Sequence, residues 1–229
     1  MRSIVALLVL VSPLAADTSG RRWAEPGPVR IAILYSRGVE PGSAPRLRAM
    51  KATVTIVTPD GLKQALKKTD LLFLTSEWAC GAERQAVAQS RAEVEAFLRR
   101  GGAIYVSQPN IDAKITDLPL AFEVVNGYDT QDRGIAIDAK LFSGLEEVEL
   151  PFPADRIVKY DAAFTVAAKG SSSGSPSVLL GHWKGGKILV NTDNDNVSDI
   201  KQFAVKTSHT SDRCLKKLIE WLAGHPLPK

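Results

Sequence analysis

The chain has 229 residues, of which 45% are hydrophobic and 24% are charged, and its formal net charge is +4. This length suits one good-sized domain, or two only if both are small. The composition is that of an ordinary globular protein. The small positive excess is spread along the chain, which argues against a surface that binds nucleic acid.

The N-terminus has the three parts of a secretory signal peptide. Met1-Arg2 is a positive start, Ile4 to Val11 is an unbroken apolar run, and Ala15-Ala16 offers a cleavage site. The run is too short to span a bilayer comfortably, and no later segment is apolar enough to do so. We expect residues 1–16 to be removed, which makes the protein periplasmic or secreted with no membrane span, and residues 17–28 to be a flexible lead-in. A buried strand or an uncleaved anchor is the alternative.

The first half of the chain predicts strands that alternate with helices. The strands are expected at 29–35, 54–58, 70–75 and 103–107, with short helices at 45–51 and 62–68 and a long helix at 83–100. In the long helix Val87, Val94, Phe97 and Leu98 fall on one face at helical spacing, and Gly101 is a natural C-terminal cap. The first, third and fourth strands are nearly all apolar, which is typical of parallel strands covered on both faces.

From Ile111 onward the pattern is less regular. Residues 118–125 could form a short helix or a strand, 135–137, 147–150 and 157–166 are expected to be extended, 142–145 is expected to be a turn, and 170–175 a flexible connection. Ser177–Trp183 and Lys187–Val190 predict a hairpin whose turn is Lys184-Gly185-Gly186. A last helix is expected at 211–223. We expect a single domain over 29–224.

The order of these pieces resembles the class I glutamine amidotransferase-like fold. Lys140 to Leu145 (Lys-Leu-Phe-Ser-Gly-Leu) is similar to a segment of the trehalose-utilisation (ThuA-like) branch, in which a His-Pro pair commonly stands where this chain has Ala139-Lys140. The expected hairpin and Ile219 to Gly224 resemble later parts of the same family. The resemblance covers most of the mature chain. It implies an α/β fold with a flavodoxin-like parallel sheet and helices on both faces.

The resemblance also implies where a catalytic triad would stand, and the chain departs from the family there. Glutamine amidotransferases use a Cys on a sharp turn after a strand, activated by a His with an acid. Here Ser107 is followed by Gln108-Pro109, and Asn191 to Asp193 stands where the family has His and Glu. We therefore expect the triad to be absent. Ser107 could still be a nucleophile if His182 or His209 reached it; a polar residue that ends a strand is the ordinary alternative.

The carboxyl ends of parallel strands meet at one edge of a sheet, and this edge is the candidate ligand-binding site. The candidate residues are Ser76, Glu77, Trp78, Ser107, Gln108, Asp193 and Asp195. Glu77 with Asp193 or Asp195 could form a carboxylate pair for acid–base chemistry or bind a hard cation, and Trp78 could stack on a sugar ring. A solvated turn and a loop anchor are the alternative interpretations.

Cys80 and Cys214 could form a disulfide in an exported protein. A loop thiol at Cys80 and a buried thiol at Cys214 are equally compatible with the sequence. The cysteines and the three histidines are too scattered to indicate a zinc site, and we expect no cofactor.

Three functions are compatible with these observations. The first is a non-catalytic member of the fold that binds a small molecule or a protein partner. The second is a ThuA-like enzyme that acts on a carbohydrate through strand-end carboxylates. The third is an accessory component of a complex in the cell envelope.

Overall fold

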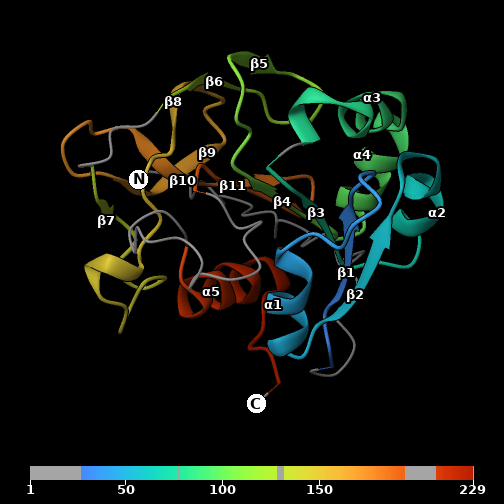
Figure 1. Ribbon diagram of the computed structural model, residues 1–229, viewed down its shortest axis with the longest axis horizontal. Helices are drawn as coiled ribbons and strands as arrows, with labels where there is room; N and C mark the ends of the chain where they lie inside the picture. The colour runs from blue at the N-terminus through green and yellow to red at the C-terminus, as the bar shows by residue number, and fades with distance from the viewer. Residues whose placement is uncertain (1–26, 77, 128–131, 194–209, 229) are drawn as a thin grey trace, which may run out of the picture.

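The computed structural model describes residues 27–76, 78–127, 132–193 and 210–228 (Figure 1). The expected signal peptide and nearly all of the lead-in lie outside these residues. The described strands are β1 (Arg30–Leu34), β2 (Thr53–Val57), β3 (Leu71–Leu74), β4 (Ala103–Ser107), β5 (Ala113–Ile115), β6 (Phe122–Asn126), β7 (Gly134–Ala136), β8 (Asp155–Tyr160), β9 (Phe164–Gly170), β10 (Pro176–Trp183) and β11 (Gly186–Asn191). The described helices are α1 (Ser43–Ala49), α2 (Leu62–Leu66), α3 (Ala82–Gln89), α4 (Arg91–Arg99) and α5 (Asp212–Ala223).

The main sheet has the strand order β2-β1-β3-β4-β11-β10-β9-β7. The first five strands in this order run parallel to one another. β10 pairs antiparallel with β11, and β9 and β7 continue the sheet in antiparallel pairs. The expected α/β fold is therefore confirmed. The parallel half is flavodoxin-like, and an antiparallel half extends it.

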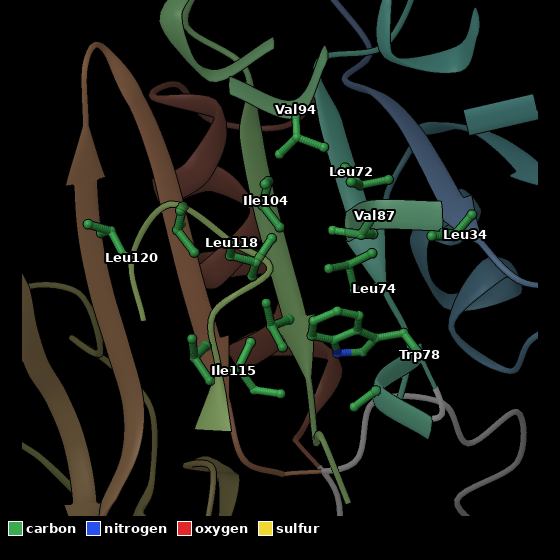
Figure 2. Packing of buried hydrophobic residues seen from close by; sticks show 14 of the residues in the cluster. Leu34, Leu72, Leu74, Trp78, Val87, Val94, Ile104, Ile115, Leu118 and Leu120 are labelled. Carbon is green, nitrogen blue, oxygen red and sulfur yellow. The ribbon is translucent and has the colours of Figure 1, made fainter. Parts of the chain in front are cut away.

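Helices cover both faces of the main sheet and bury two hydrophobic cores. Leu72 and Leu74 of β3 point into the first core, under α2, α3 and α4. Leu71 and Phe73, which alternate with them, point into the second core, under α1 and α5. Figure 2 shows the first core, where Val87 and Val94 of the helices lie over β3 and β4. Burial on both faces explains why these strands are apolar at every position.

A second, three-stranded sheet in the order β5-β6-β8 closes the first core. Its inner face contributes Ile115, Phe122 and Ile157 to that core. Phe122 also meets Phe164 of β9 in an edge-to-face contact, with ring centroids 6.3 Å apart. The small sheet thus packs on the main sheet through aromatic and aliphatic side chains. Among the described residues no helix is both long enough and apolar enough to span a membrane.

The expected long helix over 83–100 is two helices, α3 and α4, with a break at Ser90. Its apolar face is as expected, because Val87 and Val94 are both buried. Ser90 has φ −102° and ψ 21°, outside the helical range, and its N–H donates to Ala86 O at 2.9 Å and Val87 O at 3.2 Å. A serine at this position ends one helix and begins the next, a preference that the hydrophobic spacing alone does not reveal.

Two expected extended segments are also different in the structure. Residues 157–166 belong to two strands in different sheets, β8 and β9, separated by a turn in which Asp161 Oδ1 accepts the N–H of Ala163 at 2.9 Å. Residues 147–149 form a 3₁₀ turn, capped by a hydrogen bond from the N–H of Glu146 to the Glu149 carboxylate at 2.9 Å. Both errors arise because a polar side chain that hydrogen-bonds the nearby backbone leaves no periodic signal.

The Ser-rich connection after β9, expected to be flexible, is a hydrogen-bonded turn. The carboxylate of Asp132 accepts the N–H of Ser172 at 2.8 Å and the hydroxyls of Ser171 at 3.3 Å and Ser173 at 2.5 Å. Burial raises the pKa of the Asp132 carboxyl, because it disfavours the charged form. The hydrogen bonds from the serines lower the pKa by more, so the net shift is downward. The partner lies about 40 residues upstream, so local composition could not predict it.

The hairpin and the last helix are as expected. Lys184 (φ 45°) and Gly185 (φ 93°) form the two-residue turn between β10 and β11, the conformation that such hairpins require. Ser211 caps α5 by accepting the N–H of Cys214 at 3.0 Å, and Gly224 ends the helix at φ 77°.

Candidate functional site

A row of polar side chains lies at the carboxyl edge of the parallel strands. The register across β1, β3, β4 and β11 aligns the residues that end or directly follow these strands. They are Tyr35, Thr75, Ser107 and Asn191, and all four are buried. Alternation along the strands places them on the side of α1 and α5. We call these four residues the polar row.

Asn191 holds the end of the row in a hydrogen-bond network. Its amide nitrogen donates to Tyr105 Oη and to Thr210 Oγ1, both at 2.9 Å. Thr210 Oγ1 donates in turn to Asp193 Oδ2 at 3.1 Å, and the N–H of Asp193 donates to Asn191 Oδ1 at 3.1 Å. The network fixes both the amide and the carboxylate, because each member is held by another.

Arg46 of α1 brings a buried cation to the same region. Its Nη2 donates to the backbone oxygen of Thr210 at 2.5 Å, and its Nε donates to Asp212 Oδ1 at 2.7 Å. The guanidinium is therefore shared between the residue that contacts Asn191 and the first turn of α5. Hydrogen bonds to a charged group are the stronger kind, so this contact ties α1, β11 and α5 together at the carboxyl edge.

Two buried hydroxyls, one in the polar row and one in α1, have no hydrogen-bond partner among the described residues. They are Oγ1 of Thr75, in the row itself, and Oγ of Ser43, in the first turn of α1. Both side chains are 0% exposed. Buried polar atoms nearly always have a partner in native structures, and leaving one without costs about 1–3 kcal/mol. The two hydroxyls are therefore unsatisfied groups inside the protein, which an ordered water, or a ligand that enters when this edge of the sheet opens, would satisfy.

Two acids mark the opposite side of the sheet at this edge. Glu83 of α3 is buried and accepts the N–H of Ser36 at 2.9 Å and its hydroxyl at 2.5 Å. Asp155, at the start of β8, is 0% exposed and accepts the N–H of Asn110 at 2.8 Å. Its second oxygen, Oδ1, has no hydrogen-bond partner among the described residues. Glu83 thus fixes the turn after β1, and Asp155 fixes the loop after β4.

The pKa of Asp155 is well above the usual range of a carboxyl. Burial raises it to about 6, the hydrogen bond from Asn110 opposes the rise, and the nearby charge of Asp112 adds to it. A carboxyl of this kind is protonated in a large share of molecules at mildly acidic pH. It differs in this respect from the ordinary solvated carboxyls of the surface.

The candidate residues from the sequence fall into three groups. Ser107 and Asp193 lie in or directly beside the polar row and its network. Ser76 is buried and Gln108 is partly exposed; they follow β3 and β4 at the same edge of the sheet. Glu77 and Asp195 lie outside the described residues. The structure thus brings part of the candidate set together and leaves the expected carboxylate pair untested.

Trp78 is not a platform for a sugar ring. It belongs to a 3₁₀ turn, Trp78–Cys80, and its side chain is 0% exposed. Figure 2 shows its indole within the first core, near Ile115 and the end of β4. Stacking on a ligand needs an open ring face, so the loop-anchor interpretation is the correct one.

His182 cannot serve Ser107 as a base. His182 pairs with Lys187, and Lys187 pairs with Ala103 at the opposite end of β4. Ser107 lies four positions along the strand from Ala103, a distance of about 13 Å. There the ring of His182 meets Trp221 edge to face at 5.5 Å, and burial lowers its pKa. His209 lies outside the described residues.

Cys80 and Cys214 do not form a disulfide in the structure. Cys80 is exposed in the turn whose Trp78 and Ala79 pack in the first core, whereas Cys214 is part of α5 and is buried in the second core. The two residues are therefore on opposite sides of the main sheet, so the interpretation as a loop thiol and a buried thiol is the correct one. Within the described residues, no three His, Cys, Asp or Glu side chains are grouped so that they could hold a metal ion.

Several residues of the site were missed from the sequence. They are Ser43, Thr75, Tyr105, Glu83, Asp155, Arg46 and Thr210. Thr75 carried a usable signal, because it directly follows an apolar strand, as Ser107 does. The other six lie within helices, within a strand or before a helix, where a polar residue is ordinary. Their roles depend on contacts with distant parts of the chain.

The chain was compared with known proteins by sequence and by structure. No family model and no curated protein matches it. Its structure is similar to the cytoplasmic protein STM3548 from Salmonella typhimurium, with a TM-score of 0.56 and 9% identity over 85% of this chain and 98% of that one. It is also similar to a protein described as a GMP synthase component from Thermoplasma acidophilum, with a TM-score of 0.54 and 14% identity over 86% and 94% of the two chains.

A ThuA-like protein from Parabacteroides merdae is similar as well. The TM-score is 0.52 at 9% identity, over 88% of this chain and 92% of that one. Identities this low establish the fold and nothing finer. The chain has the glutamine amidotransferase-like and ThuA-like α/β fold that its sequence resembles.

Proposed function

We propose that this chain is an exported, non-catalytic binding protein whose ligand is a polar small molecule held at the polar row. The observation that carries the proposal is the pair of buried hydroxyls without a partner, Thr75 Oγ1 and Ser43 Oγ. A ligand that hydrogen-bonds both would remove the cost of leaving them unsatisfied. Thr75 lies at the edge where folds of this kind bind their ligands, and Ser43 begins α1, the helix that follows β1.

The chemistry of the surrounding groups favours a ligand rich in hydroxyls, such as a sugar or a polyol. Hydroxyls, an amide and a carboxylate each accept or donate hydrogen bonds without demanding a charged partner. Arg46 is already engaged by Thr210 and Asp212, so it supports the network more than it offers a free charge. A neutral ligand with several hydroxyls matches these hydrogen-bonding groups.

The absence of catalysis is proposed from the surroundings of Ser107. A serine nucleophile needs a base within hydrogen-bond reach, and His182 lies at the opposite end of the strands. Export is proposed from the signal-like pattern of residues 1–16. In an exporting host, the intact mass of the purified protein should then correspond to a chain that begins at Asp17.

The binding proposal is tested by calorimetric titration of the mature protein with a panel of monosaccharides, disaccharides and polyols. For any ligand that binds, Thr75→Val and Ser43→Ala should each weaken the affinity about three- to tenfold, the value of one hydrogen bond. Thr69→Val is the matched control. Thr69 is a buried threonine at the other end of β3, and its hydroxyl donates to Arg30 O at 2.9 Å. Unchanged affinity in the Thr75→Val, Ser43→Ala double variant would contradict the proposal.

A second candidate is a ThuA-like enzyme that acts on carbohydrate through strand-end carboxylates. It is favoured by Asp155, whose pKa of about 6 suits a general acid near neutral pH. Release of nitrophenol from aryl glycosides, lost in Asp155→Asn, would support it. An aryl-glycoside panel that gives no activity above buffer would count against it.

A further inference from the structure

β2 is an edge strand of the main sheet, and no strand among the described residues pairs with its outer side. The N–H of Thr53 donates to Val29 O and Val57 O accepts the N–H of Tyr35, both at 2.9 Å, so the odd-numbered residues of β2 face β1. In a parallel pairing the residues between them point their N–H and C=O groups the other way. Val54 and Ile56 therefore present backbone donors and acceptors at the edge.

β2 lacks the features that normally protect an edge. It has five residues, TVTIV, with no charge, proline or glycine, and its register with β1 is unbroken. By contrast, the edges β5 and β7 have three residues each, and β8 has exposed charged side chains and a register shift. An unprotected edge is a template for pairing with another strand.

The side chains of β2 are complementary to a second copy of β2. In an antiparallel arrangement centred on Thr55, Val54 lies opposite Ile56 of the other copy, and Thr55 lies opposite its own counterpart. Val54 and Ile56 lie on the face covered by α1, in register with Ile31 and Ile33 of the second core. The Ile56 side chain is 38% exposed. Pairs of β-branched side chains across strands are favourable, and this arrangement would cover the exposed part of Ile56.

The charges that flank β2 are also complementary to those of a second, antiparallel copy. Lys51 precedes β2, Asp60 follows it, both are exposed, and neither has an ion-pair partner among the described residues. The neighbouring cations Arg48 and Lys63 are already paired, with Glu40 and Glu93. Antiparallel pairing brings the Lys51 end of one copy toward the Asp60 end of the other, where opposite charges attract.

We propose that two copies of this chain associate through their β2 strands, antiparallel about a two-fold axis at Thr55, into one continuous sheet. Val54 and Ile56 of each copy then exchange four backbone hydrogen bonds with Ile56 and Val54 of the other. A closed two-fold contact of this kind pairs the β2 edges of both copies at once and leaves no β2 edge for a third copy. The contact is small, so we expect a dimer that dissociates in the micromolar range.

A disulfide trap tests the register directly. In this arrangement the two Thr55 residues form a non-hydrogen-bonded pair with Cα atoms about 4.5 Å apart, within the range of a disulfide. In a Cys80→Ser background, which removes the exposed thiol, Thr55→Cys should give a covalent dimer under mild oxidation. Thr53→Cys is the matched control, because its counterpart lies about four residues away along the strand. A covalent dimer formed equally by both variants, or by neither, would overturn the proposal.

Sedimentation equilibrium from about 1 to about 300 µM tests the association itself. The wild-type protein should shift from monomer to dimer over this range. Ile56→Lys should remain a monomer, since it places two like charges at the contact. Val148→Lys changes a more exposed aliphatic residue elsewhere, 72% against 38% for Ile56, and should behave as wild type. A wild-type protein that is monomeric throughout, or a dimer that Ile56→Lys leaves intact, contradicts the arrangement.

Discussion

At the scale of single residues, Asp155 links a carboxyl charge to the stability of the fold. It is buried at the start of β8, and one oxygen binds the backbone after β4 while the other has no partner among the described residues. A charged carboxylate in such a place is unfavourable compared with the same group in the unfolded chain. At neutral pH the folded protein carries this unfavourable free energy of a buried charge. Buried acids with strongly raised pKa values are frequent at functional positions.

Asp155→Asn should therefore change the pH dependence of stability. The pKa of about 6 in the folded protein lies above the value of about 3.9 expected for an unfolded Asp. The folded state thus binds the extra proton between these values, and the wild-type stability falls as the pH rises from about 4 to about 6. The asparagine variant lacks this loss. Urea unfolding at pH 4 and pH 7 measures this difference. Between the two pH values, the free energy of unfolding of the variant should rise relative to that of the wild type by up to about 3 kcal/mol.

Asp161→Asn is the control for this experiment. Asp161 lies in the turn after the same strand and caps Ala163. This variant should keep the wild-type slope between pH 4 and pH 7. An Asp155→Asn variant whose stability follows the wild type in parallel across that range would show that Asp155 is not the titrating group.

The sequence located some of these residues and not others. Ser107 and Asp193 were predicted because each follows an apolar strand, and strand ends converge in a parallel sheet. Asp155 follows Pro-Phe-Pro-Ala and begins a strand of the other sheet, so nothing local distinguishes it from a solvated acid. Its position depends on a hydrogen bond to Asn110, 45 residues away.

At the scale of elements, the β10–β11 hairpin packs closely against the end of α4. A Cβ added at Gly186 would lie 2.7 Å from Leu98 O and 2.8 Å from Gly102 O, both backbone atoms. Backbone atoms in a helix end and a strand start cannot move aside as a flexible side chain can. The glycine is therefore required by close approach, and its φ is not in the left-handed region.

Gly186→Ala should destabilise the protein by about 2–4 kcal/mol, because the clash forces apart two packed elements. Gly174→Ala is the comparison: Gly174 has φ 67° and open space around it, so alanine there meets strain without a clash and should cost about 1 kcal/mol. Thermal and urea unfolding measure both. Equal losses in the two variants would mean that the hairpin can move away from α4.

At the scale of the whole molecule, the two cores share one sheet. Phe122 brings the three-stranded sheet into the first core, and Leu215 brings α5 into the second. The strands between them are buried on both faces, so the loss of packing in one core is transmitted to the other. This arrangement favours one cooperative unit, as the single-domain expectation requires.

Phe122→Ala and Leu215→Ala should thus lower the same unfolding transition. The expected losses are about 3–5 and 2–5 kcal/mol, the cost of the cavities they leave. Far-UV circular dichroism and tryptophan fluorescence should give coincident transitions in each variant. A second transition in Phe122→Ala alone would instead identify the three-stranded sheet as a separate unit.

The sequence by itself determined the parallel strands, the faces of the helices that pack on them, the late hairpin and the capped last helix. These features follow from short-range periodicity, turn glycines and caps, which each segment carries in its own residues. The tertiary structure alone decided the break at Ser90, the ordered Ser-rich turn, the burial of Trp78, and the Asn191 network with its unsatisfied neighbours. Each of these depends on partners far apart in the chain, as Arg46 and Thr210 are, 164 residues from each other. Such contacts exist only once the sheet has brought its strand ends to one edge.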